Sequence, residues 1–194
     1  TTSGAHNTNA NALAIQQYIS KVSAAIKSGN QAAIEGYVDM PSLVDMFILQ
    51  EFTKNCDVGG SSFYMSKDVG ADAKLVFNPP WDFDKGFGND ERGKDPTGLY
   101  SANSSNDNVN KWFNSLWSQS WFRELVKTRW AELRSDANSN PQNLIAQANE
   151  FTNDYKDSLN RNFDKWDILN KTYGWSGRSE EHTSELQSPG DLVC

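Results

Sequence analysis

Acidic residues lie on both sides of a predicted β-hairpin, and their type and spacing suit metal-assisted chemistry. Asp57 precedes the first predicted strand, and Asp82 and Asp84 follow the second. Because a hairpin returns the chain to the edge from which it started, we expect Asp57 and Asp82 to be neighbours. Clustered carboxylates repel one another, which favours a divalent cation between them. Hard oxygen ligands favour Mg²⁺, a cation that proteins commonly bind together with phosphate oxygens.

The order of these residues resembles that of protein kinases. Kinases carry a catalytic-loop Asp, a metal-binding Asn five residues later, and then a hairpin leading to Asp-Phe-Gly, whose Asp holds Mg²⁺. In this chain Asp57 is followed five residues later by Ser62, and a hairpin then leads to Asp82-Phe83-Asp84. The His-Arg pair before the kinase Asp and the Gly after Phe are absent from this sequence.

Two helices and a hairpin are predicted to position these residues. Apolar residues recur at helical spacing over 11–28, and Gly29-Asn30 ends that helix. Met40-Pro41 opens a second helix, which runs to about residue 54 and is apolar on most of its circumference, so we expect it to be buried. The segments 62–67 and 74–77 flank a turn rich in Gly and Asp, a pattern that predicts a β-hairpin.

The second half of the chain is predicted to be helical after a long loop over 92–110. A short helix spans 107–117, and a second carries an apolar stripe from Trp121 to about Arg134. One long helix is predicted from Pro141 through Trp166, with its aromatic stripe in the core. The predicted fold class is therefore α+β, mostly α, with one β-hairpin flanked by helices.

The last seventeen residues, 178–194, differ from the rest. They have no apolar face at helical or strand spacing, and residues 178–188 read like the translation of a common sequencing adapter. We therefore expect 1–177 to be the native domain and 178–194 to be a non-native tail. Because the chain opens on Thr1 rather than Met, we also expect it to be a fragment.

Composition excludes several classes of function. The net charge of -7 argues against non-specific binding to nucleic acids, and no run of apolar residues is long enough to predict a membrane span. Outside the expected tail, His6 and Cys56 are the only residues of their types. One of each is too few for a Cys/His zinc site or an internal disulfide.

The residues around the acidic positions resemble the CotH family of atypical protein kinases, the spore-coat-protein-H type. The resemblance spans about residues 11–170. Its most specific block is Pro80-Trp81-Asp82-Phe83-Asp84 followed by Phe87-Gly88-Asn89. Further matching residues are Glu51, Lys54, Asn55, Asp57, Ser62, Tyr64, Lys67 and Asp68.

This resemblance implies a protein-kinase-like C-lobe that uses ATP and Mg²⁺. It implies that Asp57 is the catalytic residue and that Ser62 and Asp82 lie at the cofactor. The metal ligands would be Asp82, Asp84 and Ser62. Two departures stand out: some relatives have Asn where Ser62 stands, and Gly59-Gly60 replaces a bulkier stretch. No glycine-rich loop or Lys–Glu pair precedes the second helix, so we expect the ATP-clamping lobe upstream of Thr1 and an inactive fragment.

The implied function is Mg-ATP-dependent phosphoryl transfer to Ser or Thr of secreted, coat or envelope proteins. An extracellular or cell-envelope location follows from the resemblance alone. The alternative is a non-catalytic, pseudokinase-like surface module that binds a protein or a glycan. A third hypothesis is metal-assisted hydrolysis of phosphoesters.

Overall fold

The computed structural model describes residues 9–103 and 108–167, and these form seven α-helices and one short 3-10 helix. In chain order the elements are α1 (Asn9–Ser28), α2 (Gln31–Glu35), α3 (Met40–Thr53), η1 (Glu91–Gly93), α4 (Asn108–Trp117), α5 (Ser120–Ser135), α6 (Pro141–Asp154) and α7 (Lys156–Lys165).

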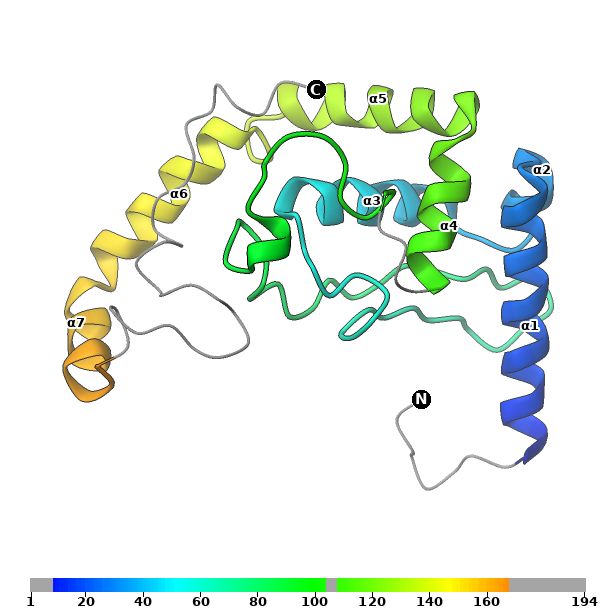
Figure 1. Ribbon diagram of the computed structural model, residues 1–194, viewed down its shortest axis with the longest axis horizontal. Coiled ribbons are helices and arrows are strands. Elements are labelled where there is room, and N and C mark those ends of the chain that lie inside the picture. Colours follow the sequence, from blue (N-terminus) through cyan, green and yellow to red (C-terminus); the bar gives the residue numbers. More distant parts are fainter. Residues whose placement is uncertain (1–8, 104–107, 168–194) are drawn as a thin grey trace.

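Helix α3 is the centre of the fold. It begins where the Asp39 side chain accepts a hydrogen bond of 2.9 Å from the backbone N–H of Ser42, with a proline in its first turn. Helix α5 packs along α3, while α4 packs against both α5 and α1 (Figure 1). The prediction of a buried helix from residue 40 to about 54 is confirmed. Its buried apolar residues are Leu43, Val44, Met46, Phe47 and Ile48.

Phe47 joins α3 to its neighbours through three aromatic contacts. Its ring meets those of Phe113 and Phe122 edge to face and stacks on that of Trp117, each with ring centroids 5.3 Å apart. Edge-to-face and stacked pairs add about 0.5–1.5 kcal/mol each beyond the area they bury. This cluster holds α4 and α5 against α3.

The predicted hairpin, and with it the α+β fold with a kinase-like C-lobe, is wrong, because no strand or sheet forms among residues 9–103 and 108–167. The two segments meet at one antiparallel bridge, where Ser66 and Val76 exchange backbone hydrogen bonds of 2.9 and 2.8 Å. The adjacent Leu75 instead forms a parallel bridge with Val38, just before α3. Neighbouring residues thus have partners in different segments, so the pairing does not extend into a ladder. Apart from η1, residues 54–103 are irregular (Figure 1).

The C-terminal helices also differ from the prediction. The expected long helix is divided into α6 and α7 at Tyr155, and neither helix has a buried residue. Its aromatic stripe therefore lies on the surface rather than in the core, and the two helices extend away from the body (Figure 1). Within the described ranges, no helix is both long and apolar enough to span a membrane. The expected tail, 178–194, lies outside the described residues.

Candidate functional site

The end of α3 presents Asp57 through a tight turn. Lys54 closes the helix in the left-handed conformation, with φ 51°. The side chain of Asn55 then accepts a hydrogen bond of 3.1 Å from the backbone N–H of Asp57. The carbonyl of Asp57 accepts hydrogen bonds from the N–H groups of Gly60 and Ser61, at 3.0 and 3.1 Å. The backbone on both sides of Asp57 is thus held, which fixes where its carboxylate points.

The acidic loop, residues 82–93, wraps around this same helix end. The backbone N–H of Phe87 donates to the carbonyl of Thr53 at 2.6 Å, and the Phe87 ring meets that of Phe52 edge to face, with centroids 5.8 Å apart. At the far end of the loop, a Cβ on Gly93 would lie 2.7 Å from the carbonyl oxygen of Lys54. Only glycine permits this approach. The loop is therefore anchored on α3 at two points: Asp82, Asp84 and Lys85 precede the first anchor, and Asp90, Glu91 and Arg92 lie between the two.

Two cations from the acidic loop lie beside the Asp57 carboxylate. The ammonium of Lys85 donates to Asp57 Oδ1 at 2.9 Å, and both side chains are largely buried, with 19% and 14% of their surface exposed. A guanidinium nitrogen of Arg92 lies 3.8 Å from the same oxygen. Arg92 is itself fixed by Asp90, which accepts two hydrogen bonds of 2.8 Å from its Nε and Nη2 atoms. These hydrogen bonds lower the pKa of Asp90, although its burial opposes the effect.

Asp82 and Asp84 form a second acidic group next to Asp57. The hydroxyl of Ser62 donates to Asp82 Oδ2 at 2.9 Å. Partial desolvation raises the pKa of Asp84, and the charge and hydrogen bond of Asp82 and the charge of Asp57 raise it further. The side chain of Asn89 donates to the backbone carbonyl of Asp84 at 2.8 Å and so holds this turn. The structure thus gathers Asp57, Ser62, Asp82 and Asp84 without the predicted hairpin.

The chemistry of these donors fits Mg²⁺ bound together with a phosphate. Asp82, Asp84 and Ser62 offer hard oxygen atoms, and the hydroxyl of Ser62 is already within hydrogen-bond distance of Asp82. In the part of the chain that the structure describes, no three His, Cys, Asp or Glu side chains are grouped so as to hold a metal ion. A magnesium ion would therefore need water or phosphate oxygens as further ligands, which is its usual state at nucleotide sites.

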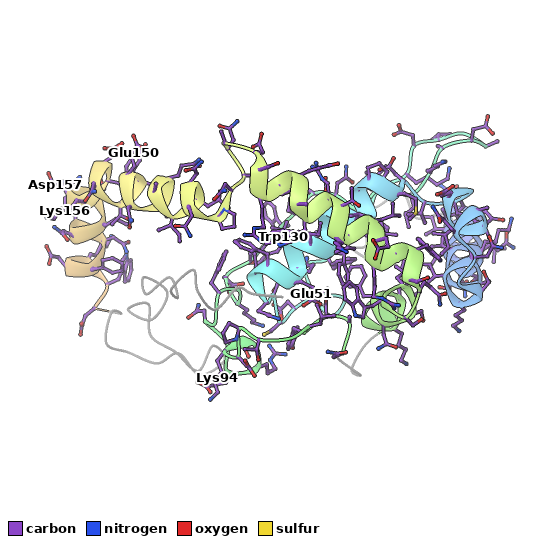
Figure 2. All side chains as sticks on the ribbon, turned by 90° about the horizontal axis from the view of Figure 1, so that it is seen from above. Glu51, Lys94, Trp130, Glu150, Lys156 and Asp157 are labelled. Atoms are coloured by element: carbon purple, nitrogen blue, oxygen red, sulfur yellow. The ribbon has the colours of Figure 1, made fainter. Side chains whose placement is uncertain are left out.

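Glu51 anchors a second loop on α3. Its buried carboxylate accepts backbone hydrogen bonds from Tyr100, Ser101 and Ala102, at 2.8, 2.8 and 3.1 Å. The Lys54 ammonium lies 3.7 Å from the same carboxylate and donates to the carbonyl of Gly98. Figure 2 shows Glu51 on α3, inside the body of the molecule. The family-like residues Glu51 and Lys54 thus have a structural explanation: they hold the loop 98–102 against the helix end that carries Asp57.

The cations were missed by sequence reasoning. Lys85 stands inside the most specific family-like block, between Asp84 and Gly86, and Arg92 lies ten residues after Asp82. The sequence does show that Lys85 is a basic residue among several carboxylates, and this pattern could have indicated an ion pair at the site. Nothing in the spacing indicated Arg92, because its position depends on the close approach of Gly93 to Lys54.

Comparison with known proteins confirms the family resemblance. A family model described as "CotH kinase protein" matches residues 2–188, nearly the whole chain. The match continues past residue 177, where we predict the native domain to end, and that boundary stays a prediction. Neither the curated proteins nor the solved structures contain a significant match to this chain.

Proposed function

The chain belongs to the CotH kinase family, and we propose that it serves Mg²⁺- and ATP-dependent phosphoryl transfer to Ser or Thr hydroxyls of a protein substrate. The observation that supports this proposal most is the gathering of Asp57, Asp82 and Asp84 at the end of α3. Family membership indicates a kinase-like function and, in general terms, the use of nucleotide and metal. Secreted, coat or envelope proteins outside the cell are the substrates that we propose.

Each residue of the site is proposed to serve one step. Asp57 orients the acceptor hydroxyl and accepts its proton, as the bond from phosphorus to the acceptor oxygen forms and the bond to ADP breaks. Ser62 and Asp82 lie on the nucleotide side, and Asp82, Asp84 and Ser62 hold Mg²⁺. When bound, this ion supplies positive charge that offsets the charge of the phosphates. Positioning and charge neutralisation would account for most of the rate enhancement.

The test measures transfer of labelled phosphate from ATP to a protein substrate by the full-length gene product. Asp57→Ala and Asp82→Asn should each lower transfer to protein by about 100-fold or more, the usual effect of removing one group that stabilises charge. Asp157→Asn is the matched control, because Asp157 lies on the helices that extend from the body (Figure 2). Its transfer rate should equal that of the wild type. Unchanged transfer in Asp82→Asn would refute its assignment to the metal.

A non-catalytic binding module is the alternative that one observation favours. Asp57 already has Lys85 as an ion-pair partner at 2.9 Å, which is the arrangement of a structural ion pair. A module of this kind would bind its protein or glycan without Mg²⁺ and would retain binding after Asp57→Ala. Release of free phosphate without labelled protein would instead indicate hydrolysis of a phosphoester.

A further inference from the structure

Lys85 is the cation in direct contact with Asp57, the residue that we propose accepts the acceptor proton. Its ammonium is 2.9 Å from Asp57 Oδ1 and has 19% of its side-chain surface exposed. Lys85 therefore contacts the proposed proton acceptor directly, and the residue before it in the chain, Asp84, is a proposed metal ligand.

The backbone of Lys85 is fixed, whereas its side chain is long. The next residue, Gly86, is buried against α3, and a Cβ there would lie 3.0 Å from the carbonyl oxygen of Phe83 and 3.1 Å from that of Thr53. Phe87 adds a backbone hydrogen bond of 2.6 Å to Thr53. The Lys85 backbone is thus held against α3, and a four-carbon side chain places the ammonium, a compact point charge, at the Asp57 carboxylate.

We propose that Lys85 is a further catalytic residue, which contacts the transferred phosphoryl group. This inference rests on the proposed function. In the transfer, the bond between phosphorus and the ADP oxygen breaks, a bond to the acceptor oxygen forms, and the acceptor proton passes to Asp57. Asp57 thereby loses its negative charge, the electron pair of the broken bond leaves with ADP, and the dianionic phosphoryl group on the acceptor oxygen lies beside the neutralised Asp57. The Lys85 ammonium contacts the terminal phosphate of bound ATP as well as the Asp57 carboxylate, and once that carboxylate is neutralised it pairs with the phosphoryl group alone; lysine is a common phosphate ligand of this kind.

Arg92 has a different role from Lys85 in this arrangement. Its guanidinium lies farther from Asp57, at 3.8 Å, and both of its hydrogen bonds to Asp90 hold it in place. Arg92 therefore supplies a charge fixed by Asp90, whereas Lys85 is the cation in direct contact with Asp57. The two cations need not contribute equally, and the test addresses Lys85 alone.

The experiment compares Lys85→Met, Lys85→Arg and Lys94→Met in the full-length protein. Lys94 is the matched control, because it lies just beyond the acidic loop, pairs with Glu91 and is half exposed, with 54% of its side-chain surface in solvent (Figure 2). The single-turnover rate of transfer should fall about 100-fold in Lys85→Met, as it does when one charge-stabilising donor is removed. Lys85→Arg should recover part of the rate, and Lys94→Met should match the wild type.

A second measurement needs no catalysis. Isothermal titration in EDTA gives the affinities for ATP and for ADP, which differ by the phosphate that Lys85 would contact. Lys85→Met should weaken ATP binding about 10-fold, the usual scale of one charge-assisted hydrogen bond, and should leave ADP binding unchanged. Lys94→Met should change neither affinity.

The outcomes separate this inference from the proposed function. If the wild type transfers phosphate and Lys85→Met keeps both its rate and its ATP affinity, the inference is overturned and the function stands. If the wild type transfers none but Lys85→Met selectively weakens ATP, the function is overturned while the phosphate contact stands. If the only change in Lys85→Met and Lys85→Arg is a lower melting temperature, Lys85 is a structural ion-pair partner and the inference is wrong.

Discussion

At the scale of single residues, burial and then the charges of Asp82 and Asp57 disfavour the ionised form of Asp84, so its contribution to stability depends on pH. The pKa of Asp84 is raised above its ordinary value of 3.8, so the folded protein binds this proton more tightly than the unfolded chain does. Stability therefore falls as pH rises from about 3.8 through the pKa of the folded state, and the penalty is fully present at neutral pH. The ionised Asp84 therefore lowers the free energy of unfolding most at neutral pH, where we propose that it holds a cation.

Asp84→Asn should relieve this penalty. We expect the variant to unfold at a higher urea concentration than the wild type at pH 7, and to lose that advantage below about pH 3.8, where Asp84 is protonated in both states. Added Mg²⁺ should narrow the difference at pH 7, because the ion stabilises only the protein that keeps the carboxylate. Asp157→Asn should not alter the pH dependence. A variant less stable than the wild type at pH 7 would show that Asp84 is a net stabilising group.

At the scale of elements, the site depends on how closely a loop approaches a helix end. The acidic loop is held by the Phe87 hydrogen bond to Thr53 and by the close passage of Gly93 over Lys54. Glu51 holds the loop 98–102 against the same helix. Irregular chain, rather than a sheet, therefore positions Asp57 and Asp82, and α3 is the rigid element against which both loops are placed.

Gly93→Ala should loosen this arrangement. The new Cβ would lie 2.7 Å from the Lys54 carbonyl oxygen and 2.8 Å from Cys56 Sγ, so the loop must shift. Overpacking of this kind costs about 1–3 kcal/mol of the free energy of unfolding. Gly36→Ala is the control, since its nearest atom is the Ala33 carbonyl oxygen at an ordinary 3.4 Å, and its cost should stay within about 0.5 kcal/mol. Equal urea midpoints for the two variants would contradict the close approach.

The helices could largely be predicted from the sequence, because their signals are local. The apolar period and the stop at Gly29-Asn30 gave α1, and Met40-Pro41 marked the start of α3. The hairpin was wrong because two short segments around a turn rich in Gly and Asp are equally compatible with extended chain whose partners lie in different segments, as for Leu75 with Val38. The gathering of Asp57 and Asp82 was expected for that wrong reason. The cations beside Asp57 could not be predicted, because their placement depends on a contact between residues 54 and 93.

At the scale of the whole molecule, the described chain divides into a packed body and an extended arm. The body holds α1 to α5 around α3, with Phe47 1% exposed at its centre. The arm, defined as α6 and α7, carries an exposed aromatic pair, Phe151 and Tyr155, whose ring centroids are 4.6 Å apart. Figure 2 shows Glu150, Lys156 and Asp157 at the end of this arm, away from the body. Helical periodicity reported an amphipathic segment correctly, but it cannot say whether a partner covers the apolar face.

Truncating a phenylalanine to alanine should therefore lower the free energy of unfolding much more in the body than in the arm. Phe47→Ala should cost about 3–5 kcal/mol, because it removes a buried ring from three aromatic contacts and leaves a cavity. Phe151→Ala should change the free energy of unfolding by no more than about 0.5 kcal/mol, because that side chain is 59% exposed and the arm has no buried residue. Urea unfolding of both variants, followed by tryptophan fluorescence, checks the pair. A large loss in Phe151→Ala would mean that the arm packs on the body in solution, and the division into body and arm would then be wrong.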